Sequence, residues 1–410
     1  MRSNILKLFA LVVCCALGLV SFIVLRQRNM PGTDSKVHRS NWNTVAAANY
    51  LESREVWWQR WPSAQMDHGT VCISCHTVVP YAMVQPALRQ RLGEKDRTAP
   101  ETAMLNSVEK RVTEWAQMAP FFSEAAGPGK AAESRATESV LNAVILANYD
   151  AADRHLRPVT RLAFDEAWAL QEKTGDNAGG WKWQNFHLRP WESNESSYQG
   201  AALFAVALGS APDGYLNDEG IRENVNRLEG YLRTKYASQP IMSQLYVLWA
   251  SAKMPALLSD SDRAALTARI EELQRPDGGW ALSTMDEADS WKKVLRARWN
   301  ELTHPRRSDG CATGLAVLAL QIHAANANEI VLQRGLNWLN QHQEDDGSWW
   351  ATSLNGSYDP DSDIARFMQD AATGYAVLAL DTAGIPGSTS GGAPQSKSSA
   401  VSEPPKTATY

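Results

Sequence analysis

The chain has 410 residues, a net charge of −5 and 44% hydrophobic residues, enough apolar material for two or three domains with buried cores. Acidic and basic residues are well mixed along the sequence, and it contains no polybasic run. This pattern excludes binding to nucleic acid, or to an anionic lipid surface, through a basic field.

The first predicted element is a signal-anchor within residues 1–28. The uncharged apolar run Leu8–Leu25 has 18 residues, just enough to cross a bilayer as a helix. It lacks a convincing small-residue cleavage site, so we predict a single-pass transmembrane helix that is not removed. A polar linker follows over residues 29–41, containing Pro31 and Gly32.

The next segment, residues 42–157, is predicted to be helical and contains Cys72-Ile73-Ser74-Cys75-His76. Two cysteines three residues apart, with a histidine directly after the second, is the spacing that attaches a c-type haem. The thiols bond the two vinyl groups of the porphyrin, and the histidine is the proximal ligand of the iron. The motif therefore predicts one covalent haem c held by Cys72, Cys75 and His76.

The distal ligand of this haem iron is open in the sequence. Met118 is the leading candidate, because it follows the motif at a reasonable interval and a proline lies two residues further on. His68, His155 and His187 are the alternatives. A lone methionine or histidine is more often a packing or surface residue than a ligand.

Two other interpretations of the cysteine pair are less favoured. A redox-active thiol pair is typical of a strand-then-helix setting, whereas this region is predicted to be helical. A zinc site needs a second cysteine or histidine pair, and the sequence supplies none. Cys14 and Cys15 lie in the anchor and Cys311 is alone, so no pair remains for a structural disulfide.

Haem is joined to such motifs on the outer side of a bacterial membrane. We therefore expect a protein of the bacterial inner membrane with most of its chain in the periplasm. A redox protein of this kind needs a partner, either another protein or a small molecule, that donates or accepts electrons.

Residues 158–383 are predicted to form a ring of helix pairs, because amphipathic and almost wholly apolar helices alternate. The amphipathic outer helices are predicted at Phe164–Gln171, Ile221–Tyr236, Arg263–Gln274 and Ile330–Gln343. The apolar inner helices are predicted at Gln199–Gly209, Ser243–Ser251, Gly310–Leu320 and Asp370–Leu380. The last two inner helices, GCATGLAVLAL and DAATGYAVLAL, have nearly the same sequence.

A shared motif, Q-x-x-D-G-x-W, lies at the joints between these helices. It occurs at Gln274–Trp280 and Gln343–Trp349, and a stretched version runs from Gln171 to Trp181. The Asp-Gly pair ends the outer helix in a tight turn, and the tryptophan is expected to fold back over the glutamine. The motif is predicted to tie each outer helix to the loop that enters the next inner helix.

This pattern resembles the Gln-Trp repeats of squalene-hopene cyclases and prenyltransferase β-subunits. The resemblance covers about residues 161–384 and implies an all-α toroid of helix pairs. It implies no particular activity, since such rings host unrelated functions.

The resemblance also suggests where an active site would lie. Hopene cyclases carry clustered aspartates at the start of an inner helix, and this chain has only Asp370 at the matching place. Prenyltransferase β-subunits bind zinc through an Asp-Gly-Cys, which matches Asp309-Gly310-Cys311, but the expected later histidine is Gln369. Asp309 and Asp370 are thus weak catalytic candidates, and helix N-capping is their simpler role.

Calcium is a minor alternative. Asp359, Asp361, Asp363 and Asp370 have calcium-loop spacing, with Ile364 in place of the turn glycine.

Residues 384–410 are rich in Ser, Pro and Gly and are predicted to be a disordered tail. The sequence as a whole favours a periplasmic haem protein that performs redox chemistry on or near a ligand held by the ring. The alternatives are a cyclase-like or lipid-binding toroid for an isoprenoid, and a non-catalytic scaffold.

Overall fold

A computed structural model describes residues 41–285, 307–322, 328–355, 358–359 and 362–388. The predicted signal-anchor lies outside these residues, as do most of the predicted linker and tail. The described residues fall into one compact unit, so residues 42–157, which contain the Cys72–His76 motif, and the predicted ring of residues 158–383 are parts of the same body.

The regular elements of the described residues are all helices, which confirms the all-α prediction. The outer helices are α2 (Thr44–Arg60), α4 (Ala99–Thr113), α6 (Pro158–Leu170), α8 (Arg222–Lys235), α10 (Asp260–Glu272) and α14 (Glu329–Gln341). The inner helices are α3 (Val78–Leu92), α5 (Lys130–Asp153), α7 (Ser196–Ser210), α9 (Ile241–Ser251), α13 (Gly310–Ile322) and α15 (Phe367–Thr382). A short helix, α11 (Leu282–Met285), precedes α13.

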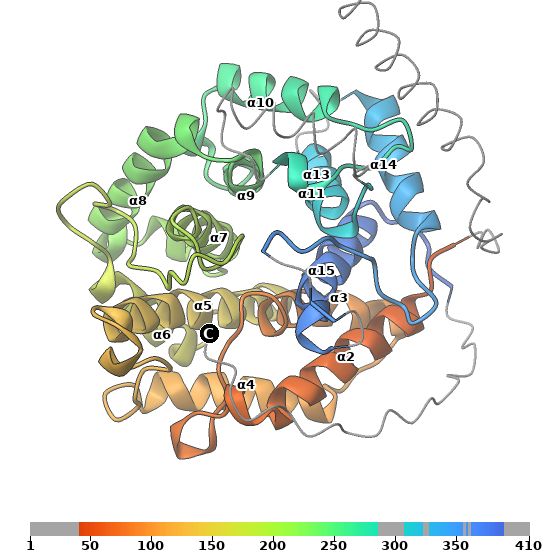
Figure 1. Ribbon diagram of the computed structural model, residues 1–410. Coiled ribbons are helices and arrows are strands. Elements are labelled where there is room, and N and C mark those ends of the chain that lie inside the picture. Colours follow the sequence, from red (N-terminus) through yellow and green to blue (C-terminus); the bar gives the residue numbers. More distant parts are fainter. Residues whose placement is uncertain (1–40, 286–306, 323–327, 356–357, 360–361, 389–410) are drawn as a thin grey trace, which may run out of the picture. The chain divides into compact units, whose positions relative to one another are not determined.

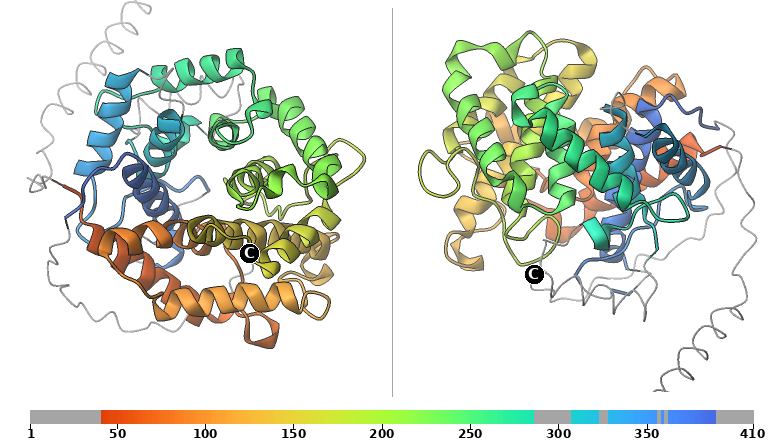
Figure 2. Two further views of the ribbon diagram at one scale, coloured as in Figure 1. Left: turned by 180° about the vertical axis from the view of Figure 1, so that it is seen from behind. Right: turned by 90° about the horizontal axis from the view of Figure 1, so that it is seen from above.

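The inner helices close into a ring in the order α3, α5, α7, α9, α13, α15 and back to α3, with the outer helices around them (Figures 1 and 2). This is the predicted α/α toroid. The sequence left open whether the segment 42–157 is a separate domain or part of the ring. In the structure its helices α3 and α5 are two of the inner helices.

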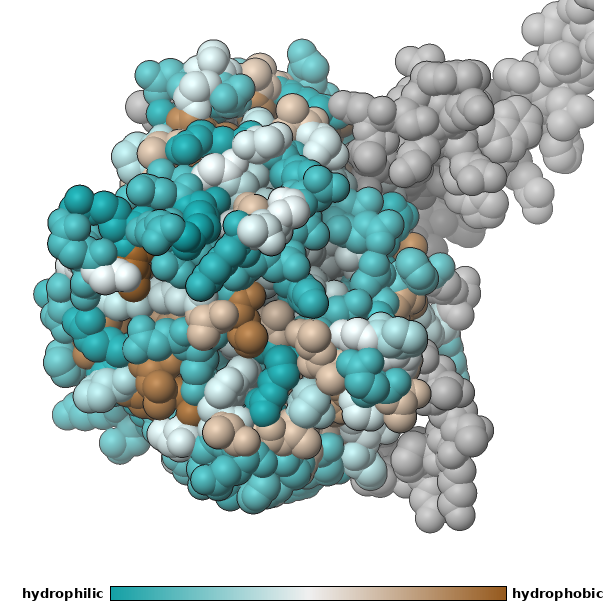
Figure 3. All heavy atoms as spheres, turned by 90° about the vertical axis from the view of Figure 1, so that its left-hand side faces the viewer, coloured by the Kyte–Doolittle hydropathy of each residue, from teal (hydrophilic) through white to brown (hydrophobic). Residues whose placement is uncertain are grey.

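The apolar character of the inner helices explains their place. Nearly every residue of α13 is buried, and Gly314 lies so close to α15 that a Cβ there would be 2.7 Å from the backbone of Tyr375 and Ala376. Small residues let the two inner helices pack backbone against backbone. The outer helices turn a polar face to water, and the side of the ring that includes α8 is mostly hydrophilic (Figure 3).

The three Gln-Trp joints make the same hydrogen bonds. Each glutamine Nε2 donates both to a carbonyl in its own turn and to a carbonyl at the start of the next outer helix. The acceptors are Gly179 and Asn224 for Gln171, Gly278 and Val331 for Gln274, and Gly347 and Asn43 for Gln343, at 2.7 to 3.0 Å. Each tryptophan Nε1 donates to a carbonyl of its own outer helix: Ala167, Ile270 or Leu339. The joint therefore links successive outer helices as well as the turn.

The glycine of each joint is required by close approach. Gly179, Gly278 and Gly347 have φ between +93° and +99°. A Cβ on Gly347 would lie 2.1 Å from the carbonyl oxygen of Ala46 in α2. Only glycine combines this backbone conformation with contact to the neighbouring helix.

The third joint closes the ring between distant parts of the sequence. The Gln343 side chain accepts from the Asn43 backbone N–H at 2.6 Å and donates to the Asn43 carbonyl at 3.0 Å. Asn340 Oδ1 accepts from the Trp42 backbone, and Ser388 pairs with Asn43. The start of the described chain thus takes the place of the next repeat.

We predict that Gln343→Ala lowers the free energy of unfolding by about 2 kcal/mol, because it removes the donor to the Gly347 carbonyl and the acceptor of the Asn43 backbone N–H. Gln333→Ala, at an exposed position on α14, is the control and is expected within about 0.5 kcal/mol of wild type. Urea denaturation followed by circular dichroism measures both. Equal midpoints for the two variants would contradict a role of this glutamine in ring closure.

Candidate functional site

The Cys72–His76 motif lies in a turn immediately before α3. The segment was predicted to be helical, but the helix begins only at Val78, because Ser74 Oγ accepts the backbone N–H groups of Thr77 and Val78 at 3.2 and 3.1 Å. Trp58 Nε1 donates to the Cys72 carbonyl at 2.7 Å and holds the turn against α2. The motif therefore lies in a turn that hydrogen bonds fix at the start of an inner helix.

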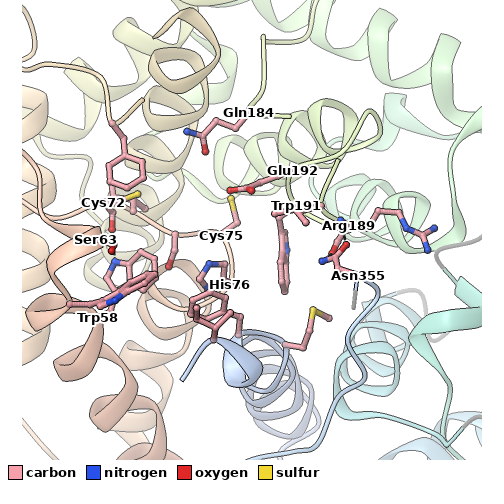
Figure 4. Close-up of a pocket in the computed structure, with 18 of the residues that line it drawn as sticks. Trp58, Ser63, Cys72, Cys75, His76, Gln184, Arg189, Trp191, Glu192 and Asn355 are labelled. Atoms are coloured by element: carbon pink, nitrogen blue, oxygen red, sulfur yellow. Dashed lines mark hydrogen bonds between the residues drawn. The ribbon is translucent and has the colours of Figure 1, made fainter. Parts of the chain in front are cut away.

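The three side chains predicted to bind haem line one cavity of about 360 Å³ (Figure 4). Its wall is mainly aromatic and apolar, a composition typical of ligand sites of this size. The aromatic residues of the wall are Trp58, Trp61, Phe121, Phe122, Trp191, Tyr358 and Phe367. They come from distant parts of the sequence, so the cavity exists only because the ring is closed.

His76 is enclosed by aromatic rings. Its imidazole stacks on Phe367, with ring centroids 3.8 Å apart, and meets Trp58 edge to face at 5.3 Å and Trp191 at 5.7 Å. Burial, together with the nearby Arg54 guanidinium, lowers the pKa of His76 to about 3. The imidazole is therefore neutral at physiological pH, which is the form that binds a metal.

One imidazole nitrogen of His76 is engaged by the protein. Nδ1 lies 2.9 Å from Thr77 Oγ1, and that hydroxyl donates to Asp370 Oδ2 at 2.7 Å. Asp370 is fully buried at the start of α15. A polar chain thus runs from His76 to the C-terminal inner helix.

Asp370 is also the point where α2 meets α15. Arg54 Nε donates to its two oxygens at 2.9 and 3.1 Å, and the Tyr50 hydroxyl donates at 2.9 Å. Burial raises the pKa of Asp370 above its ordinary value, although Arg54 and the hydrogen bonds from Thr77 and Tyr50 act against this rise. The Arg54 side chain is only 3% exposed, and a neutral Asp370 would leave this buried cation without its buried counter-charge. We therefore assign the carboxylate form to Asp370.

The two thiols of the motif are free and partly buried in the cavity wall. Burial raises the pKa of both Cys72 and Cys75, and the Glu192 carboxyl contributes in the same direction. Reactive thiol pairs have lowered pKa values, so these cysteines lack the electrostatic setting of a redox-active pair.

Glu192 is a carboxyl group of this cavity that the sequence did not single out. Its backbone pairs with Leu188 across the turn that contains Pro190, and its side chain lies beside Cys75 (Figure 4). Burial raises the pKa of Glu192 to about 7, with Lys130 acting in the opposite direction. No sequence pattern marks it, because it reaches the cavity through an irregular loop.

The other predicted ligands lie elsewhere. Met118 does not line the cavity: it is buried, and its Sδ accepts from Arg111 at 3.8 Å. The methionine in the cavity wall is Met368, at the start of α15. His68 and His155 are paired with Asp67 and Asp213 at exposed positions, and His187 is likewise no part of the cavity wall.

Asp309 has a structural position. Its carboxylate accepts the backbone N–H groups of Ala312 and Leu282 at 2.9 and 2.6 Å, so it caps α13. Burial raises its pKa to about 7. Within the described residues, no three His, Cys, Asp or Glu side chains are grouped as metal ligands, and Asp363 of the calcium-like spacing pairs with Arg54.

The comparisons with known proteins concern the ring. Residues 237–388 match the family model of the squalene-hopene cyclase C-terminal domain, which supports a squalene cyclase-like α/α toroid. A search of curated proteins finds no match. Among the described residues, no helix is long and apolar enough to span a membrane.

A comparison with solved structures finds a wild-type glycosidase, with 11% identity, a TM-score of 0.47, and coverage of 86% of this chain and 99% of that chain. A glycosidase variant in complex with glucose has 12% identity and a TM-score of 0.46, with the same coverage.

Glu192 is expected to make stability depend on pH. Its pKa in the folded protein, about 7, is above the ordinary value of 4.5, so the folded state favours the protonated form. The contribution of Glu192 to stability is therefore fully present below about pH 4.5 and is lost as the pH rises to about 7. Glu192→Gln should remove this loss, as measured by thermal unfolding across that range.

The matched control is Glu223→Gln, at a side chain that is 79% exposed, which should follow the pH profile of wild type. If wild type and Glu192→Gln changed in parallel over the range, the buried carboxyl would not titrate there.

Proposed function

We propose that the cavity is the attachment site of one haem c, bonded through Cys72 and Cys75 and ligated by His76, and that the chain is a redox protein built on a cyclase-like toroid. One observation carries the proposal: both thiols and a neutral imidazole of the motif line the same apolar cavity. A bound haem supplies one-electron chemistry at its iron.

The residues present fit this group. The thiols are free for thioether bonds, and the aromatic wall offers flat apolar surfaces that exclude water. Arg189 and Asn355 lie on the other side of the cavity from Cys72 and Trp58 (Figure 4). The Arg189 backbone N–H donates to Asn355 Oδ1, and Asn355 Nδ2 donates to the Arg189 carbonyl, both at 2.7 Å, which fixes this part of the cavity wall.

The proposal extends to the setting of the protein. Covalent haem attachment would place the ring in the periplasm, tethered by the anchor predicted within residues 1–28, with an electron donor or acceptor as its partner. Met368 lines the cavity and Met118 does not, so Met368 is the methionine proposed as distal ligand of the iron.

A second candidate function is the binding of an apolar ligand such as an isoprenoid in the same cavity, without haem. The family match favours it more directly, because that match supports the ring and covers none of the residues Cys72–His76. Cyclisation is not part of this candidate. Alkene protonation needs a strong acid facing a dry cavity, whereas Asp370 is paired with Arg54.

Visible spectroscopy of full-length protein, produced in cells that mature c-type cytochromes, tests the first function. We expect red protein whose reduced pyridine adduct has the c-type spectrum, and loss of covalent haem in the Cys72→Ala/Cys75→Ala variant. Cys311→Ala is the matched control and should keep its haem, because Cys311 is buried in α13 and does not line this cavity. Colourless wild-type protein with both motif thiols open to alkylation would contradict the assignment.

The second function predicts that polyprenyl compounds bind to colourless protein and quench its tryptophan fluorescence, because Trp58, Trp61 and Trp191 line the cavity. Trp191→Ala should weaken binding about tenfold or more, since one buried aromatic contact contributes over 1 kcal/mol. Trp115→Ala, outside the cavity, is the control. Absence of saturable quenching, or cyclic products formed on incubation, would contradict this form of the second function.

A further inference from the structure

A line of hydrogen bonds connects α2 to the imidazole in the cavity. It passes from Arg54 to Asp370, from Asp370 to the Thr77 hydroxyl and from there to His76 Nδ1, with distances of 2.9, 2.7 and 2.9 Å. Arg54, Asp370 and Thr77 are buried and do not line the cavity, whereas His76 does. Arg54, Asp370 and Thr77 can therefore affect a group bound in the cavity only through His76.

The proton positions along this line follow from the donors available. A carboxylate paired with a guanidinium only accepts, so the single proton of the Thr77 hydroxyl points to Asp370. Toward His76 the hydroxyl therefore offers a lone pair. A neutral imidazole carries one N–H, and this N–H has to be the one at Nδ1.

We infer that Asp370, acting through Thr77, is a positioning residue that holds His76 as the Nδ1–H tautomer and leaves the Nε2 lone pair bare. The consequence for iron rests on the proposed haem site; the tautomer does not. Asp370, which matches the position of the catalytic acid in hopene cyclases, would thus orient the histidine that is proposed to bind the iron.

The arrangement is held from several sides. Arg54 also donates to Asp363, through Nη1 to its side chain at 2.6 Å and through Nη2 to its carbonyl at 2.8 Å. Phe367 of the same α15 stacks on the imidazole. Thr77 at Nδ1 and Phe367 against the ring face together fix the orientation of the imidazole, which limits the rotation that would exchange its two nitrogens.

A hydrogen bond from Nδ1 to a carboxylate-backed acceptor increases the basicity of Nε2, and a more basic ligand favours ferric over ferrous iron. Removing the acceptor should therefore weaken the preference for ferric iron. Mutation of a residue that hydrogen-bonds to a metal-binding histidine typically lowers the metal affinity by about 10- to 100-fold.

The tautomer is tested by ¹⁵N NMR of histidine-labelled, full-length protein made without cytochrome maturation, with His76→Gln identifying the resonance. We expect the Nδ1–H form in wild type and in Thr77→Ser, which keeps the hydroxyl. Thr77→Val should lose that preference. An Nε2–H form in wild type, or a wild-type spectrum in Thr77→Val, would overturn the inference; the wild-type result does not depend on the folding of any Thr77 variant.

In haem-loaded protein, Thr77→Val should raise the reduction potential by about 59 mV or more, the equivalent of a tenfold change for one electron. Thr77→Ser should stay near wild type. Colourless protein with the Nδ1–H tautomer would overturn the haem proposal and support the positioning role. Red protein with an unchanged potential in Thr77→Val and no tautomer preference would overturn the positioning role alone.

Discussion

The buried ion pair between Arg54 and Asp370 joins three parts of the molecule that the sequence keeps far apart. It links α2 to α15, and through Thr77 it reaches the turn that carries the two thiols and His76. Such a pair adds little net stability compared with apolar packing, but removing one partner costs about 3–5 kcal/mol. Its value lies in specifying one geometry at the closure of the ring.

The ring and the cavity depend on each other. The Gln-Trp joints connect successive outer helices, and the joint at Gln343 places the first described helix against the last ones. This closure brings α3 beside α15 and sets the motif turn against Phe367 and Met368. The cavity therefore forms where the ring closes, between α3 and α15, and no single repeat contains it.

Asp370 illustrates how one scaffold accommodates different chemistry. At the start of an inner helix, a carboxyl group facing a dry cavity is placed to act as an acid. Here Arg54, Tyr50 and Thr77 donate hydrogen bonds to the carboxyl group, and Asp370 is not part of the cavity wall. The fold is that of a cyclase-like toroid, whereas the chemistry depends on which donors surround this residue.

The sequence by itself determined the helices of residues 158–383 and their arrangement in helix pairs, and it left open that α3 and α5 complete the ring. Apolar periodicity and the repeated Q-x-x-D-G-x-W are local patterns, and most predicted helices of this segment lie close to the observed ones, as with Ile330–Gln343 against Glu329–Gln341. The exception is α6, which begins at Pro158 rather than at the predicted Phe164. The motif also marked Cys72, Cys75 and His76, because their spacing is itself the chemical signal.

Only the tertiary structure decided what surrounds them. Glu192, Met368 and Thr77 carry no pattern of their own, and Met118, favoured by its interval from the motif, packs against Arg111 instead. The helix expected over the motif is displaced to Val78 by the hydroxyl of Ser74. These features arise from contacts across nearly 300 residues of chain, such as Thr77 with Asp370, and local sequence periodicity holds no information about which distant side chains meet when a ring closes.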